Sequence, residues 1–344
     1  MGTQLSWSRP FAKCHIAGAI AVFLTVLITI EPLHAKQELW RGGPIAPLPP
    51  LENIDPEKAQ LGEALFHDPR LSADDTVSCA TCHDLSSGGA DGLAKAIGIG
   101  GAEGPINTPT VYNSAYNFSQ FWNGRAETLE EQAAGPVHNP VEMGANWGMV
   151  IPKLYADEDI RKTFEKLYPD GITADNIVDA IATFERTLVT VNSPFDQYLR
   201  GDKDAITAEA EQGYQLFQSY GCAACHQGVN VGGNMYQTMG AMGDYFGDRG
   251  NVDNSDMGRY TVTGREKDRH VFKVPSLRMV VHTAPYFHDG SAETLQDAIR
   301  NMAKYQLGRE IADTDVQKII AFLASLAGEY ERFDPNDYKR PDPD

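Results

Sequence analysis

Two short motifs in the chain combine a pair of cysteines with a histidine at identical spacing. They read Cys79-Ala80-Thr81-Cys82-His83 and Cys222-Ala223-Ala224-Cys225-His226. Cys-x-x-Cys-His is the signature of covalent c-type haem attachment. Its two thiols reach the two vinyl groups on one porphyrin edge, and its histidine places an imidazole nitrogen on the iron. The sequence therefore predicts two covalently bound haem c groups.

Two other kinds of site use paired cysteines. A zinc site could take four thiolate ligands from these motifs, and a Cys-x-x-Cys pair can be a redox-active dithiol. Neither explains why a histidine directly follows both pairs. Haem attachment accounts for all six residues.

An internal repeat leads into each motif. Residues 59–66 read AQLGEALF and residues 210–217 read AEQGYQLF. Asp55 and Pro56 form a good cap and first-turn pair for the earlier segment, which predicts a helix there. We therefore expect two copies of one unit, in which a helix leads into a haem-binding turn, as in a cytochrome c domain.

The remaining apolar patterns are mostly helical. Thr173 is predicted to cap a helix with apolar residues at helical spacing, and Thr294 with Asp297 forms a capping box before another. A third helix is expected over 315–326. The fold class is therefore mainly α.

Strand-like alternation is sparse, and the chain is long enough for two domains. Only residues 260–263 and 271–274 suggest strands. We expect two cytochrome c-like domains over 36–192 and 193–330, each with one covalent haem, followed by a loose tail over 331–344.

The first 35 residues have the layout of a secretory signal peptide. Arg9 and Lys13 precede an apolar stretch over 16–30, and Ala35 offers a small residue for cleavage. An uncleaved anchor is the alternative, but 15 residues are fewer than the roughly 20 that span a bilayer. Cleavage would leave 27 basic and 46 acidic residues, a net charge of −19. Such acidity argues against nucleic-acid binding.

Five further segments, read together with the two motifs, carry a family resemblance. They are GPINTPTV at 104–111, FWNGR at 121–125, GPV at 135–137, VEM at 141–143 and APYFHDG at 284–290. The chain resembles the bacterial di-haem cytochrome c peroxidases, a family that also holds the MauG-type enzymes. The resemblance runs from about Pro56 to Gly328. It implies a periplasmic enzyme that reduces hydrogen peroxide to water with electrons from a small carrier, a cytochrome c or a cupredoxin. Family members are commonly homodimers.

The resemblance also implies that the two haems differ. Met302 matches the axial methionine of the family, so His226 and Met302 would hold the electron-entry haem at high potential. From the pattern alone, Met302 would instead be part of an apolar helix face with Leu295 and Ile299, because a methionine there is usually core.

The haem on His83 would keep an open face for peroxide. Glu142 matches the distal carboxylate of the family, Gln132 its accompanying amide, and Trp122 the aromatic residue between the two haems. Read without the resemblance, Glu142 and Gln132 would be ordinary polar residues and Trp122 would pack in the core.

One position departs from the family pattern. Many members carry a histidine that blocks the peroxide site until the other haem is reduced, and the corresponding residue here is Ile99. Because isoleucine cannot ligate iron, we expect a five-coordinate first haem that needs no prior reduction. The alternative is that another histidine substitutes, and His67 and His138 are nearest in sequence.

The resemblance further implies a calcium ion, held by the Asn107 side chain and by the carbonyls of Thr283 and Pro285. Oxygen ligands of this kind suit calcium.

Two other functions compete with peroxide reduction. A MauG-like enzyme would oxidise a protein substrate at a distance, which the absence of the blocking histidine favours and Met302 opposes, because MauG has a tyrosine as that ligand. A di-haem electron carrier would need neither Glu142 nor Gln132.

Overall fold

The computed structural model describes residues 43–51 and 53–330. The predicted signal peptide over 1–35 and the tail over 331–344 lie outside the described residues. Within the described part of the chain, no helix is both long enough and apolar enough to cross a membrane.

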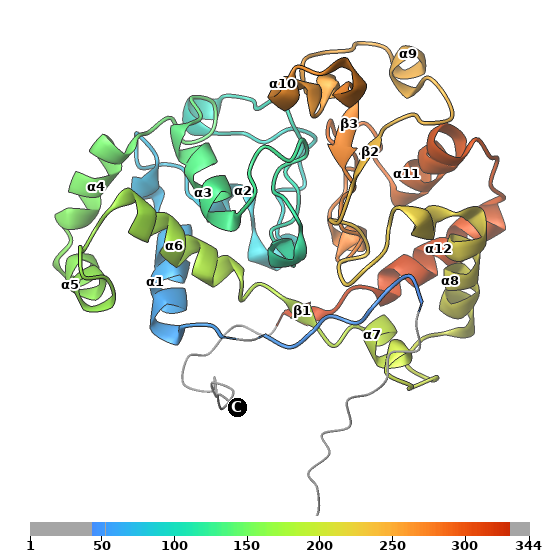
Figure 1. The fold of residues 1–344 in the computed structure, drawn as a ribbon, viewed down its shortest axis with the longest axis horizontal. Helices are drawn as coiled ribbons and strands as arrows, with labels where there is room; N and C mark the ends of the chain where they lie inside the picture. Colours follow the sequence, from blue (N-terminus) through green and yellow to red (C-terminus); the bar gives the residue numbers. More distant parts are fainter. Residues whose placement is uncertain (1–42, 52, 331–344) are drawn as a thin grey trace, which may run out of the picture. The chain divides into compact units, whose positions relative to one another are not determined.

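The described residues form a helix-rich fold with little sheet, as expected (Figure 1). The helices are α1 Pro56–Phe66, α2 Cys79–Cys82, α3 Leu129–His138, α4 Trp147–Tyr155, α5 Glu158–Leu167, α6 Ala174–Glu185, α7 Pro194–Leu199, α8 Ala208–Tyr220, α9 Tyr245–Arg249, α10 Tyr260–Thr263, α11 Leu295–Asn301 and α12 Asp313–Ser325. The strands are β1 Thr190–Val191, β2 Tyr236–Thr238, β3 Val271–Lys273 and β4 Glu329–Tyr330. They pair in two antiparallel ribbons, β1 with β4 and β2 with β3.

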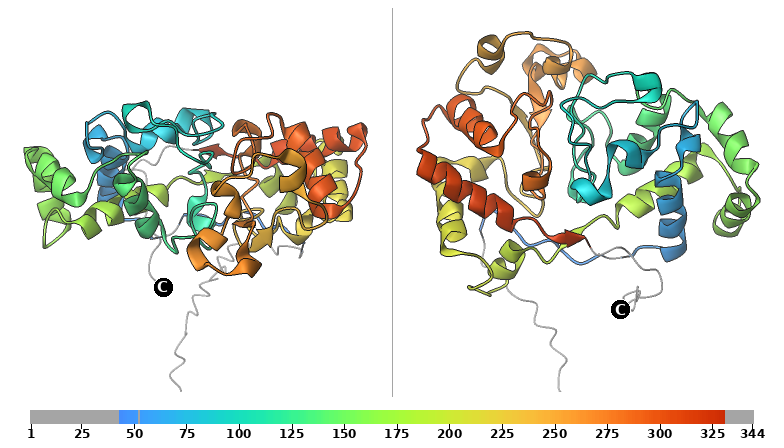
Figure 2. Two further views of the ribbon diagram at one scale, coloured as in Figure 1. Left: turned by 90° about the horizontal axis from the view of Figure 1, so that it is seen from above. Right: turned by 180° about the vertical axis from the view of Figure 1, so that it is seen from behind.

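The two halves of the repeat fold alike. Helix α1 packs across α6, and α8 packs across α12 (Figures 1 and 2). Gly62 of α1 and Gly213 of α8 occupy the same position in the repeat. A Cβ at either would overlap a carbonyl oxygen of the partner helix, that of Ala180 or of Lys318. Glycine at this position therefore lets each pair of helices approach closely.

An aromatic pair follows each glycine by four residues. Phe66 packs edge-on against Phe184 with 5.3 Å between ring centroids, and Phe217 lies 5.1 Å from Phe322. All four rings are buried. The sequence repeat thus corresponds to a structural repeat of two crossed helices with the same core contact.

Two large apolar clusters fill the interior. One includes Leu65, Val137 and Phe164 and lies among α1, α3, α4, α5 and α6. The other includes Phe217 and Phe322 and gathers residues from 195 onward, together with Ile45 from the N-terminal segment. These clusters give each Cys-x-x-Cys-His motif a rigid support.

The predicted caps are present. The Asp55 carboxylate accepts hydrogen bonds from the backbone amides of Glu57 and Lys58, and the hydroxyls of Thr173 and Thr294 cap α6 and α11. The strand expected over 271–274 is confirmed as β3.

The strand suggested for 260–263 is wrong, because these residues form the single helical turn α10. Gly258 and Gly264 bracket this turn with positive φ angles of 56° and 64°. The Thr261 hydroxyl donates to the Gly258 carbonyl at 2.7 Å. Local turn chemistry outweighs the β-propensity of the segment.

Candidate active site

The first motif forms one short helical turn. Helix α2 spans the two cysteines, and the backbone amide of His83 donates to the Cys79 carbonyl at 2.9 Å. The Nδ1 of His83 lies 3.2 Å from the Gly89 carbonyl. This contact fixes the ring orientation and leaves Nε2 available to a ligand.

The second motif repeats this geometry. A 3₁₀ turn spans Cys222–Ala224, and the His226 amide donates to the Cys222 carbonyl at 3.0 Å. The ring is buried, and burial lowers the pKa of His226 to about 4 and also lowers the pKa of His83. Both imidazoles are therefore neutral at neutral pH, the form that ligates iron.

None of the four cysteines of the motifs forms a disulfide within the described residues. Burial raises the pKa of Cys79 to about 12 and those of Cys82 and Cys222 to about 11. A reactive dithiol needs a lowered thiol pKa, so the environment does not match that alternative.

A single cavity brings the second motif together with Met302. Cys222, Cys225, His226 and Met302 all line it. Met302 begins a π-helical turn, Met302–Gln306, directly after α11. Much of the remaining wall is apolar, with residues such as Leu295, Ile299, Leu307, Ile319 and Leu323. Two thiols, a neutral imidazole and a thioether around an apolar cavity fit the donor set of a c-type haem.

Glu142 lies close enough to the first motif to raise the pKa of the Cys82 thiol. Asn139 donates a hydrogen bond from Nδ2 to Glu142 Oε1 at 2.7 Å. Burial raises the pKa of Glu142, while Arg125 and Asn139 act in the opposite direction. The carboxylate is thus half-buried beside the first motif.

Gln132 lies half-buried on α3. No hydrogen bond joins the Gln132 and Glu142 side chains anywhere in the described chain. The structure therefore places the two in one half of the fold without bringing them into direct contact.

Trp122 lines the cavity of the second motif. Its Nε1 donates to the Asn107 carbonyl at 3.0 Å, and its ring lies 6.3 Å from that of His288 in an edge-on arrangement. The neighbouring Phe121 carries the Arg125 guanidinium at 3.3 Å from its ring centroid. Residues 121–125 thus extend from Trp122 in the cavity wall to Arg125, whose charge acts on Glu142.

Ile99 packs against the apolar cluster of the N-terminal half. The Ile99 side chain lies 3.4 Å from the position that a Cβ on Gly144 would occupy. His67 and His138 are both exposed, and the Nδ1 of each contacts a carbonyl of its own helix. Neither histidine is directed into the protein interior.

Asn107, Thr283 and Pro285, the residues implied for calcium, line one cavity, the same as that of the second motif. The Asn107 amide nitrogen donates to the Leu93 carbonyl at 2.8 Å. Among the described residues, the Asn107 side-chain oxygen and the Thr283 and Pro285 carbonyls accept no hydrogen bond. These three oxygens therefore have unused acceptor capacity.

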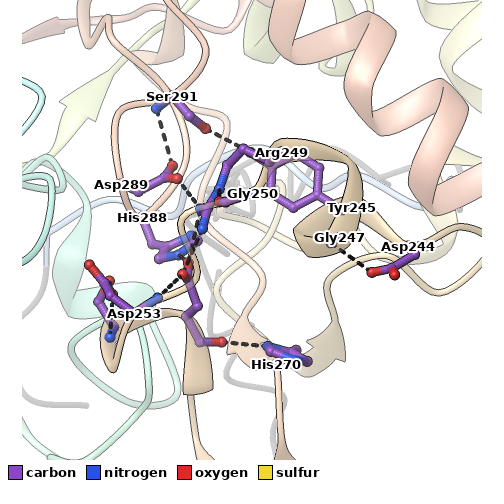
Figure 3. Close-up of polar contacts among 12 residues, drawn as sticks. Asp244, Tyr245, Gly247, Arg249, Gly250, Asp253, His270, His288, Asp289 and Ser291 are labelled. Atoms are coloured by element: carbon purple, nitrogen blue, oxygen red, sulfur yellow. Dashed lines mark hydrogen bonds and ion pairs between the residues drawn. The ribbon is translucent and has the colours of Figure 1, made fainter.

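A buried ionic cluster beside this cavity was not expected from the sequence. The His288 Nε2 donates a 2.7 Å hydrogen bond to Asp256 Oδ1. Arg249 pairs with Asp256 and also with Asp289, and Figure 3 shows Arg249 beside His288 and Asp289. The His288 carbonyl accepts from the Asn107 amide at 2.8 Å. Arg249 neutralises the acids, so the cluster supports the segment that carries Asn107 and Trp122.

Two further buried charged residues were missed. Lys273, at the end of β3, lines the cavity, and Glu185, at the end of α6, is 5 % exposed. The repeat could have indicated that Glu185 is buried. Phe184 and Phe322 make the same core contact in the two halves, so Glu185 aligns with Leu323. Leu323 lines the second cavity, and the Glu185 carboxylate contributes to raising the pKa of Cys79.

Comparison with known proteins agrees with this geometry. Residues 56–204 match the family model of the di-haem cytochrome c peroxidases. Cytochrome c peroxidase Ccp of Escherichia coli (strain K12) is 50 % identical over 291 residues, which cover 84 % of this chain and 62 % of that protein. The chain thus spans less than two thirds of that relative.

Two further similarities extend over most of both chains. Cytochrome c551 peroxidase of Nitrosomonas europaea is 46 % identical over 83 % of this chain and 86 % of that protein. The crystal structure of a MauG-like protein associated with microbial copper homeostasis has a TM-score of 0.72 at 28 % identity, covering 84 % of this chain and 94 % of that one.

The chain therefore belongs to the di-haem cytochrome c peroxidase family, which includes MauG. The family and the enzyme class expected from the sequence, a cytochrome c peroxidase, are confirmed.

Proposed function

We propose that the chain is a periplasmic di-haem cytochrome c peroxidase that reduces hydrogen peroxide to water. The observation that carries this proposal is the inequality of the two motifs. The second shares a cavity with Met302, whereas the first lies beside the carboxylate of Glu142. The names of relatives that are 42–50 % identical support the same reaction.

The proposed cofactors are two covalent haem groups, one in each of the two cytochrome c-like domains. Cys79 and Cys82 would attach the first haem, and His83 would ligate its iron. Cys222 and Cys225 would attach the second, and His226 and Met302 would ligate its iron. When bound, the second haem would supply electron transfer and the first would supply peroxide reduction.

Glu142 is the proposed acid–base residue. Converting one hydrogen peroxide into two waters consumes two electrons and two protons, and one proton must move between the peroxide oxygens. Asn139 holds Oε1, and in the described part of the chain Oε2 has no hydrogen-bond donor. Oε2 is therefore the atom that takes up and returns the proton, with the amide of Gln132 as the accompanying donor.

The test is steady-state peroxide consumption with reduced cytochrome c as donor. Glu142→Gln removes the exchangeable proton and should lower turnover about 10²- to 10⁴-fold. Glu127→Gln, at an exposed position, makes the same change of side chain as the matched control and should retain turnover. Unchanged turnover in Glu142→Gln would contradict the acid–base role. Redox cycling of the parent protein without peroxide consumption would leave only an electron carrier.

Ile99 makes the proposed enzyme active without prior reduction. Ile99 packs into the apolar cluster and cannot ligate iron. His67 and His138 are exposed, so neither is proposed as a substitute.

The electron donor is proposed to be a small protein with a basic face, a cytochrome c or a cupredoxin. A net charge near −19 on the exported chain would steer such a donor electrostatically. A homodimer is proposed because it is the common state in the family.

A calcium ion is proposed at Asn107, Thr283 and Pro285. Their free acceptor oxygens and their shared cavity support this assignment, because calcium takes side-chain amide and backbone carbonyl oxygens.

MauG-like oxidation of a protein substrate is the second candidate. The observation that favours it is Ile99, since an open first site is also a feature of those enzymes. Met302 favours the peroxidase. Rapid multiple turnover of peroxide with a small donor would exclude the MauG-like assignment.

A further inference from the structure

Lys273 is a buried cation without a described partner. The residue is 8 % exposed and lies in β3, opposite Tyr236 of β2. Within the described residues its ammonium has no carboxylate within 4 Å and makes no hydrogen bond, and burial alone acts on it. A buried charge without compensation is strongly unfavourable, so a partner is required.

The buried acids of the C-terminal half are already occupied. Asp256 is held by Arg249 and His288, Asp196 is paired with Arg278, and Asp268 is paired with Arg265. None of these carboxylates contacts Lys273. The described residues therefore supply no compensating anion, and a molecule bound in the cavity can supply one.

The cavity identifies that molecule. Lys273 lines the cavity together with Cys222, Cys225, His226 and Met302. A haem joined to both thiols through its vinyl edge carries its two propionate carboxylates on the opposite edge. A cation in the wall would stabilise those carboxylates, and Lys273 is a buried lysine in the wall.

We propose that the Lys273 ammonium binds a propionate carboxylate of the haem attached at Cys222 and Cys225. This inference rests on the proposed attachment of the second haem. Burial lowers the pKa of Lys273 to about 8, so the amine is mostly protonated at pH 7. The ion pair then offsets the negative charge beside the iron and favours its reduced form, which raises the reduction potential of the second haem.

The position of Lys273 also links the propionate to Trp122. The Lys273 backbone amide donates to the Trp122 carbonyl at 2.8 Å. Trp122 lines the same cavity, so the residue that binds the carboxylate is tied to the proposed conduit between the haems. Lys273 is thus a positioning residue as well as a counter-charge.

The experiment compares the parent holoprotein with three variants, Lys273→Met, Lys273→Arg and Lys267→Met. Lys267 lies on an exposed turn nearby, so Lys267→Met makes the same change of charge at the surface. Haem content is measured first. A spectroscopic redox titration then follows the reduction of the second haem.

At the midpoint potential of the parent, Lys273→Met should show a reduced-to-oxidised ratio about tenfold lower, equivalent to about 59 mV. Lys273→Arg and Lys267→Met should stay within threefold of the parent. A ratio for Lys273→Met within twofold of the parent would overturn the inference, although the two-haem assignment would stand. A parent that carries fewer than two haems would overturn both.

A crystal structure of the parent holoprotein gives a second readout that needs no variant. The Lys273 Nζ should lie within 4 Å of a propionate oxygen of the second haem. If that distance exceeds 4 Å for all four propionate oxygens, the inference is wrong.

Discussion

The backbone amide of Ile99 donates a 2.8 Å hydrogen bond to the carbonyl oxygen of Glu142. The contact requires close approach, because a Cβ on the preceding Gly98 would overlap the backbone of Val141 and Glu142. In many family members this loop carries a blocking histidine. Here its backbone is hydrogen-bonded to the backbone of the proposed acid–base residue. This arrangement is consistent with a first site that needs no activation.

Ile99→His should restore a blocking ligand. An imidazole at this position can bind iron when the loop releases its bond to Glu142, so peroxide turnover should begin only after a lag or after prior reduction. Stopped-flow measurement of peroxide consumption by the fully oxidised enzyme detects the lag. Ile97→His, at a position that is 40 % exposed, is the control and should show none. A variant that starts as fast as the parent would contradict the assignment of position 99.

Asn139→Ala should shift the pH dependence of turnover. The 2.7 Å bond from Asn139 stabilises the ionised form of Glu142 and lowers its pKa, so removing the donor raises that pKa. A base with a higher pKa becomes protonated at higher pH, so the acid limb of kcat/KM should move to higher pH. A pH profile of the parent and the variant checks this. A limb that moves to lower pH, or stays in place, would show that Glu142 does not control it.

Met302→Leu should lower the reduction potential of the second haem, because methionine ligation raises it. Met239 lines the same cavity and also carries a thioether. Met239→Leu is therefore the matched control, and the proposal expects it to titrate like the parent. Redox titration of both variants decides between the two methionines. If only Met239→Leu lowers the potential, Met302 is not the ligand.

Glu185→Gln should reduce the pH dependence of stability. Burial raises the pKa of Glu185 to about 8, and Oε2 has no partner among the described residues. The folded protein keeps this proton up to about pH 8, while the unfolded chain loses it near the ordinary value of 4.5. The free energy of unfolding therefore falls as pH rises between these values, by an amount on the order of several kcal/mol.

Guanidinium unfolding of the holoprotein at pH 5 and pH 8 measures this effect. The decline in the free energy of unfolding should be smaller in Glu185→Gln than in the parent. Glu165→Gln, on the surface of α5, should decline like the parent. An equal decline in all three proteins would mean that Glu185 does not hold the proton.

Much of the fold follows from local signals. The Asp55 cap and the repeat before each motif predicted α1 and α8, because capping and helical periodicity depend on neighbouring residues. The strand prediction for residues 260–263 was wrong, because the glycines on either side determine a helical turn there. The haem-attachment residues could be predicted from the spacing of their cysteines and histidines alone.

The buried charges could not be predicted in this way. Lys273 and Glu185 are ordinary charged residues in the sequence, and their burial depends on packing between distant segments. The His288–Asp256 pair joins residues 32 positions apart. Such groups are recognisable only when the cavity around them is known, although the repeat already aligns Glu185 with the cavity residue Leu323.

The coordination of the two irons tests the central claim most directly. Electron paramagnetic resonance of the fully oxidised holoprotein, recorded with its optical spectrum, reports the ligands of each haem. The account predicts one low-spin centre with histidine and methionine ligands, at His226 and Met302, and one high-spin centre at His83. Two low-spin centres, each with two protein ligands, would contradict it.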